Sequence, residues 1–152
     1  MARVQEGSRE DLRRGVDFIG VCCVFWCHDG KGKVLLHKRS AACRDEQGAW
    51  DVGSGAMEFG EDFESAVRRE LKEEYCVEPL EIKFLVADNV RRASDGKNTH
   101  WVALRFAVLV DSKKVKIGDP KGMDEIGWFT PDNLPSPLHS QFRRHYEFVK
   151  KA

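Results

Sequence analysis

Three glutamates, Glu70, Glu73 and Glu74, lie three and four residues apart, at the spacing that places side chains on one side of a helix. On a helical wheel of about 100° per residue, Glu70 and Glu74 fall within the arc that carries Val67 and Leu71. Stability alone does not explain carboxylates on the apolar face of a helix, because unpaired buried carboxylates are costly. Clustered carboxylate oxygens are the ligands that Mg²⁺ and Mn²⁺ prefer, so this spacing indicates a site for a divalent cation.

Glutamate-rich helices also occur as ordinary solvent-exposed faces, so the spacing alone leaves a second interpretation open. The flanking residues favour the metal site. A flexible run, Gly53-Ser54-Gly55, precedes the expected helix, and Glu61 lies where a helix N-terminus favours negative charge. Arg69 directly precedes Glu70 and is placed to orient or partly neutralise a carboxylate.

Residues 55–77 resemble the Nudix box, the sequence signature of the Nudix hydrolases, which include the MutT-like enzymes. The box has a glycine, five variable residues, a glutamate, seven variable residues and then Arg-Glu-U-x-Glu-Glu-x-Gly-U, where U is a bulky aliphatic residue. The matching residues are Gly55, Glu61 and the run Arg69-Glu70-Leu71-Lys72-Glu73-Glu74-Tyr75-Cys76-Val77. Cys76 replaces the last glycine, which normally allows a left-handed backbone at this position without strain. We expect the backbone at Cys76 to stay right-handed or to tolerate mild strain.

The resemblance implies a divalent cation, Mg²⁺ with Mn²⁺ as a substitute, as the cofactor. The implied metal ligands are Glu70, Glu73, Glu74 and the carbonyl oxygen of Gly55. Arg69 is expected to pair with a box carboxylate, and Glu61 to lie nearby as a minor or water-mediated ligand. The general base is expected to be a box glutamate, with Glu70 as the first choice, or an acid from a loop outside the box.

Four further segments are similar to the cytosolic Nudix branch that hydrolyses modified nucleoside triphosphates, namely Glu58–Glu61, Asp88–Val90, Thr99–Val102 and Asn133–Leu138. The leading expectation is therefore a Mg²⁺-dependent pyrophosphohydrolase in which water attacks a phosphoanhydride of a normal or modified nucleoside triphosphate. The alternative is a pyrophosphatase for ADP-ribose or a nucleoside-diphosphate sugar, which would use the same box. A non-catalytic nucleotide-binding Nudix domain is disfavoured, because such domains usually lose box glutamates and all three are present.

Substrate recognition is expected outside the box. Arg39, at the end of a strand, is a candidate partner for a phosphate, although an exposed strand end would look the same. Asp124 and Glu125 resemble the paired acids that read a purine edge in oxidised-purine Nudix enzymes, and a solvated turn beside Trp128 is the alternative. His100 is a candidate substrate contact by its place in the wider likeness, whereas an isolated strand histidine is more often structural.

Composition limits the class of protein. The chain has 152 residues, 33% of them charged and 41% hydrophobic, which fits one soluble globular domain. Its 25 basic and 25 acidic residues give no net charge, which argues against binding a nucleic-acid polymer. No apolar signal segment or membrane-spanning run is visible, and the odd number of cysteines fits reduced thiols, so we expect a cytoplasmic protein.

The order of expected elements predicts an α/β fold. Strands are expected over residues 16–27, 33–39, 50–55, 80–90, 100–110 and 125–130, and helices over 62–75 and 138–150. Residues 1–15 would form a flexible or edge-strand arm, and residues 16–152 a single domain. The resemblance implies a Nudix α/β/α sandwich with a central mixed sheet and a loop–helix–loop box. The expected partner is a small nucleoside diphosphate derivative, bound by a monomer or a homodimer.

Overall fold

The central strand of the sheet, β1 (Gly20–His28), alternates its side chains between two cores in the computed structural model of the chain. Cys23 and Phe25 enter one core, whereas Val24 and Trp26 pack into the other. Because successive side chains of a strand point to opposite faces, both faces of the sheet are apolar and both need a cover. The structure describes residues 12–94 and 96–152.

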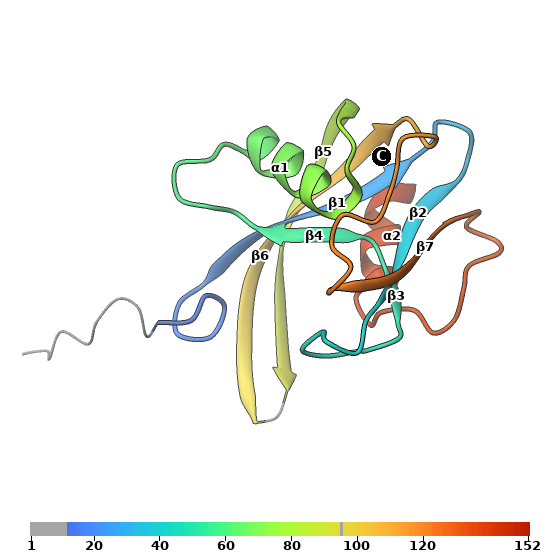
Figure 1. Ribbon diagram of the computed structural model, residues 1–152. Helices are drawn as coiled ribbons and strands as arrows, with labels where there is room; N and C mark the ends of the chain where they lie inside the picture. The colour runs from blue at the N-terminus through green and yellow to red at the C-terminus, as the bar shows by residue number, and fades with distance from the viewer. Residues whose placement is uncertain (1–11, 95) are drawn as a thin grey trace, which may run out of the picture.

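The sheet is mixed, with the main strand order β3-β2-β1-β6-β5 (Figure 1). The other strands are β2 (Val34–Arg39), β3 (Trp50–Asp51), β4 (Gly53–Ala56), β5 (Pro79–Ser94), β6 (Lys97–Val110) and β7 (Met123–Phe129). Strands β1 and β6 pair in parallel, while β4 pairs with β1, and β7 with β2, in antiparallel fashion. This arrangement brings the short strand β4, which precedes the first helix, against the centre of the sheet.

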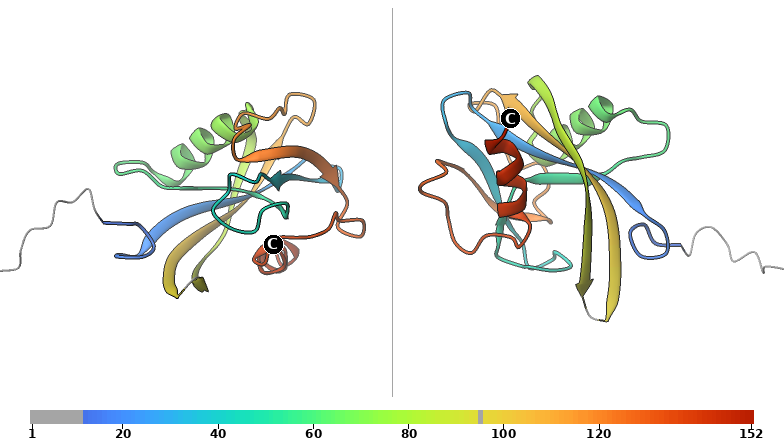
Figure 2. Two further views of the ribbon diagram at one scale, coloured as in Figure 1. Left: turned by 60° about the horizontal axis from the view of Figure 1, so that its bottom comes forward. Right: turned by 180° about the vertical axis from the view of Figure 1, so that it is seen from behind.

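Two helices cover the two faces of the sheet. Helix α1 (Phe63–Tyr75) buries Val67 and Leu71 in the first core, and helix α2 (Phe142–Lys150) buries Phe142 in the second. Figure 2 shows α1 and α2 on opposite sides of the strands. The expected α/β fold, an α/β/α sandwich around a mixed sheet, is therefore confirmed. Neither of these helices has the length and apolar character that crossing a membrane requires.

Both ends of α1 have defined caps. Asp62 precedes the helix and accepts a hydrogen bond from the backbone N–H of Ser65 at 2.8 Å. At the other end Cys76 has φ of 54°, in the left-handed region, and its N–H bonds to the carbonyl of Lys72 at 3.2 Å. The expectation of a right-handed backbone at Cys76 is therefore wrong, and the alternative of mild strain fits, at a cost of roughly 1–2 kcal/mol.

Several expected boundaries differ from those in the structure: β5 runs on to Ser94 and β6 begins at Lys97, so the turn expected over residues 91–97 is shorter, and the strand expected over residues 50–55 is divided into β3 and β4. Two further boundaries have a clear physical cause. Helix α2 begins at Phe142 and not at Leu138, because residues 137–139 run alongside Trp50 and exchange backbone hydrogen bonds with it. Strand β1 begins at Gly20 and not at Val16, because residues 13–18 form a turn. In both places a non-local backbone contact or a tight turn uses the hydrogen-bonding groups that the expected element needed.

The expected N-terminal arm over residues 1–15 falls mostly on residues 1–11, which lie outside the described part of the chain. At its end, Arg14 donates to the carbonyl of Met57 at 3.0 Å and to Glu58 Oε2 at 3.2 Å. The last residues of the expected arm are thus joined to the loop that leads into α1.

A charged cluster lies between the sheet and α2. Arg105 of β6 is only 2% exposed, and it donates to Asp88 Oδ1 at 2.6 Å and to His145 Nδ1 at 3.0 Å. Since a guanidinium only donates, Nδ1 of His145 must accept, and the imidazole is neutral. Burial, together with the positive charge of Arg105, lowers the pKa of His145 to about 3.

This lowered pKa should make stability fall in mild acid. An unfolded histidine takes up a proton near about pH 6.5, whereas folded His145 resists protonation down to about pH 3. Between these two pH values, His145 should lower the free energy of unfolding by up to about 1.4 kcal/mol for each unit by which the pH falls. Urea unfolding at several pH values gives the free energy of unfolding as a function of pH. This free energy should fall less steeply with decreasing pH for His145→Gln than for the wild type. Equal slopes would contradict a buried neutral imidazole.

Candidate active site

Arg69 joins the loop before α1 to the helix itself. Its guanidinium donates to Glu61 Oε1 at 2.5 Å, to Glu70 Oε1 at 2.6 Å and to the carbonyl of Ala56 at 3.0 Å. The hydrogen bond from Arg69 lowers the pKa of Glu61 to about 2. Arg69 therefore connects the loop to the helix and orients Glu70. The contact with Glu70 is the pairing with a box carboxylate that the sequence predicted.

Glu70 is buried against the glycine loop, with a residue exposure of 9%. A methyl group added at Gly55 would overlap the carboxyl group of Glu70, so this close approach requires glycine. Burial raises the pKa of Glu70, and the hydrogen bond from Arg69 opposes the rise. The inward orientation expected from the helical wheel is present, and it places the carboxylate directly beside the Gly55 backbone.

Glu74 carries a buried carboxylate oxygen, Oε2, that has no hydrogen-bond partner among the described residues. A methyl group at Gly53 would lie 2.8 Å from this oxygen. Burial and the neighbouring Glu70 raise the pKa of Glu74 well above its usual range, while the backbone N–H of Ser54 acts in the opposite direction. An unpartnered buried carboxylate oxygen is costly unless a cation compensates it, so this donor set fits a divalent metal ion.

The loop before β7 brings a further acid to the same place. The N–H groups of Lys116 and Gly118 donate to the last carbonyls of α1, those of Tyr75 at 3.0 Å and Glu74 at 2.8 Å. Asp119 consequently lines a cavity of about 540 Å³ together with the three box glutamates. No spacing in the sequence relates Asp119 to the box, and its only signal is an acid between a Gly and a Pro in a polar loop.

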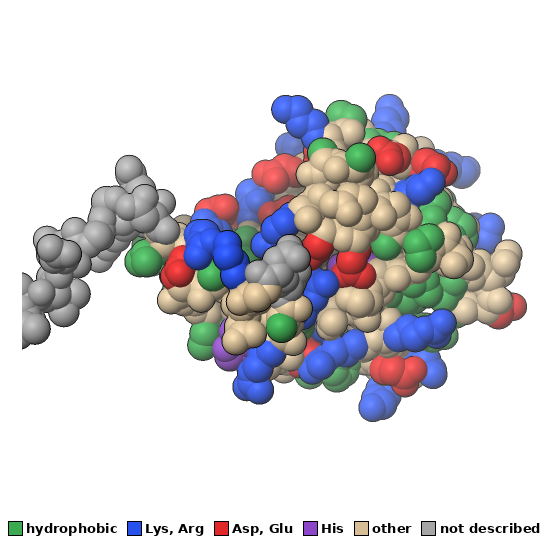
Figure 3. Space-filling view, turned by 90° about the horizontal axis from the view of Figure 1, so that it is seen from below, with side chains coloured by type: hydrophobic (Ala, Val, Ile, Leu, Met, Phe, Trp, Pro, Cys, Tyr) green, Lys and Arg blue, Asp and Glu red, His purple; other side chains and the backbone are tan. Residues whose placement is uncertain are grey.

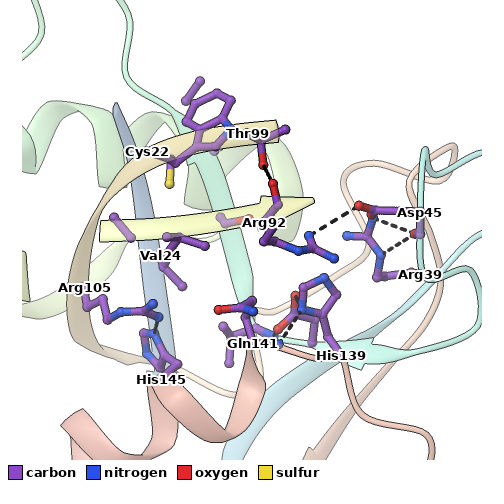
Figure 4. Close-up of a pocket in the computed structure, with 18 of the residues that line it drawn as sticks. Cys22, Val24, Arg39, Asp45, Arg92, Thr99, Arg105, His139, Gln141 and His145 are labelled. Atoms are coloured by element: carbon purple, nitrogen blue, oxygen red, sulfur yellow. Dashed lines mark hydrogen bonds and ion pairs between the residues drawn. The ribbon is translucent and has the colours of Figure 1, made fainter. Parts of the chain in front are cut away.

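A second cavity, of about 280 Å³, lies between α2 and the face of the sheet formed by β1, β4, β5 and β6 (Figure 4). Gly55 of the box loop lines it, and Trp101, Asp51 and His139 contribute an aromatic and polar wall. We call this cavity the substrate pocket, after the role that is proposed for it below. Because Gly55 also contacts the Glu70 carboxyl group, the substrate pocket and the box carboxylates meet at this glycine.

An ion-pair network closes one side of the substrate pocket. Arg39 donates to Asp45 Oδ1 at 2.8 Å and to the Asp45 carbonyl at 2.9 Å, and Arg92 lies 3.4 Å from Asp45 Oδ2. Arg92 also donates to Glu46 Oε2 at 2.7 Å. His139 Nε2 lies 2.7 Å from the same oxygen. Asp45, Glu46 and His139 are close enough to share a metal ion, but the arginines already compensate these acids.

The structure separates the substrate-contact residues that the sequence proposed. Arg39 lines the substrate pocket, whereas His100 lines a different cavity and lies 2.8 Å from Asn89 Oδ1. Asp124 and Glu125 are exposed on β7, and Glu125 pairs with Lys38 at 3.1 Å. Neither of these acids lines the substrate pocket. Arg92 and His139, which no sequence pattern indicated, reach the pocket from distant segments.

A family model, relatives in sequence and solved structures all place this chain with the Nudix proteins. The NUDIX domain model matches residues 18–152. RNA pyrophosphohydrolase from Novosphingobium aromaticivorans is 26% identical over 137 residues, which are 80% of this chain and 83% of that protein. The crystal structure of a MutT NUDIX hydrolase from Burkholderia pseudomallei has a TM-score of 0.75 and 30% identity, and covers 86% of this chain and 97% of its own.

A third relative shares the fold. The NUDIX domain of Shewanella oneidensis NrtR, in a cocrystal structure with ADP-ribose, has a TM-score of 0.70 and 21% identity, and covers 96% of this chain and 93% of its own. The family model spans nearly the whole described chain, including the box residues whose geometry is given above. On this evidence the chain belongs to the Nudix family and is a Nudix hydrolase.

Proposed function

We propose that this protein, through one domain over residues 16–152, is a Mg²⁺-dependent pyrophosphohydrolase of normal or modified nucleoside triphosphates. The observation that carries the proposal is the junction at Gly55, where the substrate pocket meets the buried carboxylate of Glu70. A nucleoside in the pocket would direct its phosphate chain toward the box. The aromatic ring of Trp101 in the pocket wall suits a nucleobase, and Arg39 suits an anionic group.

The residues that would hold the cation are Glu70, Glu73, Glu74 and the Gly55 carbonyl. The support is the unpartnered Oε2 of Glu74, next to a second buried carboxylate on the same helix. When bound, a divalent cation neutralises charge on the phosphate chain and so makes phosphorus more open to attack by water. Glu73 lines the same cavity, and its exposed carboxylate lies 3.6 Å from Arg69.

In the proposed reaction Glu70 accepts a proton from the attacking water as its oxygen bonds to phosphorus. The phosphoanhydride bond on the other side of that phosphorus breaks, and its oxygen leaves with pyrophosphate, so that a nucleoside monophosphate and pyrophosphate are released. Arg69 keeps the Glu70 carboxylate in place through its 2.6 Å contact, and Asp119 is a second acid within the same cavity that could take the role of base.

A 5′-triphosphorylated RNA end is the second candidate substrate, because the curated relatives are RNA pyrophosphohydrolases of 25–27% identity. The chemistry at phosphorus would be unchanged. The expectation that no nucleic-acid polymer binds came from the zero net charge alone, which does not exclude a local basic surface. ADP-ribose remains the alternative small substrate.

A substrate panel tests the proposal. Purified protein with Mg²⁺ should be given the four deoxynucleoside triphosphates, 8-oxo-dGTP, ADP-ribose, sugar nucleotides and a 5′-triphosphorylated oligonucleotide, with product release followed by chromatography. The proposal expects the highest kcat/KM on a nucleoside triphosphate, with pyrophosphate as product. Faster turnover of ADP-ribose or of the oligonucleotide would identify that compound's class as the substrate. If no compound were turned over, the proposed enzymatic role would be overturned.

Replacing Arg39 by Gln should raise KM for the preferred triphosphate about tenfold with little change in kcat, since a hydrogen bond to a charged group contributes about 1.5–3 kcal/mol. Steady-state kinetics measures both constants. Lys38→Gln, at the next position of β2 and paired with exposed Glu125, is the matched control and should behave as the wild type. An Arg39→Gln variant that loses stability but keeps its KM would show that Arg39 only anchors Asp45.

A further inference from the structure

A third cavity, of about 380 Å³, opens beside the substrate pocket and is strongly basic. It lies between residues 13–16, the loop before β3 and the hairpin of β5 and β6. Its charged lining residues are Arg13, Arg14, Arg44, Arg92, Lys97 and one acid, Asp45. We call it the basic cavity. Figure 3 shows blue Lys and Arg side chains gathered around the tip of this hairpin.

Several hydrogen-bond donors in the basic cavity are unused by the described residues. Arg13 contacts Asp17 only through Nε and its backbone N–H, which leaves both terminal nitrogens of the guanidinium available. Lys97 makes no hydrogen bond or ion pair with a described side chain, although, after the hydrogen bonds from Arg13, its positive charge is a minor cause of the lowered pKa of Asp17. The nearest acid to Arg44 is Asp45 at 3.9 Å. Arg14 and Arg92, by contrast, are held by Glu58 and Glu46.

The basic cavity adjoins the substrate pocket. Arg44, Asp45, Arg92 and Thr99 line both cavities, so the ion pair of Asp45 and Arg92 belongs to a wall that the two cavities share. A ligand with its phosphate chain at the box and its nucleoside in the substrate pocket would therefore lie next to the basic cavity, with Arg13 and Lys97 on the far side of this wall. The unused donors there are cationic, so they suit a second anionic group on the same ligand.

We propose that the basic cavity binds a second phosphate group of the substrate, remote from the phosphoanhydride that is cleaved. The inference rests on the proposed function for the position of the first phosphate chain. Two substrates carry such a group: a nucleotide with a phosphate on its ribose 3′ or 2′ oxygen, and a nucleotide whose 3′ oxygen begins a longer chain. Both present a phosphate on the side of the ribose away from the 5′ position.

Calorimetric titration of three product-like probes tests the proposal without any turnover. The probes are GMP, guanosine 3′,5′-bisphosphate, and the dinucleotide pGpU, which has a phosphodiester in place of the terminal phosphate. The wild type should bind at least one of the two longer probes about tenfold more tightly than GMP, the effect of one charge-assisted hydrogen bond. A preference for the bisphosphate alone would identify a terminal phosphate, and an equal gain for pGpU would identify a chain.

The variant Arg13→Ala/Lys97→Ala should abolish this tenfold advantage and leave the binding of GMP unchanged, because neither residue lines the substrate pocket. Lys113→Ala/Lys114→Ala removes the same charge from an exposed turn outside both cavities and should keep the advantage. Equal affinities of the wild type for all three probes, or an advantage that survives in Arg13→Ala/Lys97→Ala, would overturn the proposal. Hydrolysis of GTP, measured separately, reports on the proposed function, so the two failures are distinguishable.

Discussion

Replacing Glu70 by Gln should lower kcat by about 10²–10⁴-fold, the usual contribution of a general base, while the variant still folds. Gln has nearly the same shape and can still accept the hydrogen bond from Arg69, which in the wild type reaches Glu70 Oε1 at 2.6 Å. It cannot take a proton from water, and it supplies a weaker ligand for a cation. Steady-state hydrolysis of the preferred triphosphate at saturating Mg²⁺ gives kcat, and circular dichroism reports the fold.

Glu64→Gln is the matched control for this measurement. Glu64 lies in the first turn of the same helix, is exposed and makes only a 3.9 Å contact with Arg68. Its variant should keep the wild-type kcat. If Glu70→Gln also turned over at nearly the wild-type rate, Glu70 would not be the base, and Asp119→Asn would become the variant to measure.

Glu74→Gln should have opposite effects on stability and on activity. Because Oε2 of Glu74 is buried without a described partner, the carboxylate destabilises the metal-free protein. A neutral amide removes that charge, so the metal-free variant should gain about 1–3 kcal/mol, or about 2–4 °C in Tm for each kcal/mol. The same change removes a proposed metal ligand, so Mg²⁺ should raise Tm much less than in the wild type and hydrolysis should fall at least about tenfold.

Differential scanning calorimetry with EDTA and with Mg²⁺ measures both parts of this prediction. Glu73→Gln is the neighbouring comparison, because the Glu73 side chain is 60% exposed and its loss should leave metal-free stability unchanged. A Glu74→Gln variant that is less stable without metal and keeps the full response to Mg²⁺ would show that Glu74 has a structural role only.

The parts of the molecule that the sequence predicted are those set by local pattern. The spacing of Val67, Glu70, Leu71 and Glu74 defines which side of a helix each residue occupies, and the structure places these residues on the buried side of α1. The strands followed from runs of β-branched and aromatic residues. The box identified the family because its fixed positions lie within one short stretch of chain.

The parts that the sequence could not predict depend on contacts between distant segments. Asp119 reaches the box because loop N–H groups satisfy the end of α1, and Arg92 and His139 meet through Glu46. The start of α2 depends on backbone pairing with Trp50, more than 80 residues earlier in the chain. No single-sequence pattern encodes such pairings, since they depend on how the loops are placed by the finished sheet.

The central claim is that the carboxylates on α1 hold a divalent cation for phosphoanhydride hydrolysis. Crystals grown with Mn²⁺ and a non-hydrolysable triphosphate analogue test it directly, because Mn²⁺ is located by its anomalous scattering. The account predicts an anomalous peak beside the carboxylates of Glu70 and Glu74, with the phosphate chain next to it. A structure with the analogue in the substrate pocket and no metal peak at these carboxylates would contradict it.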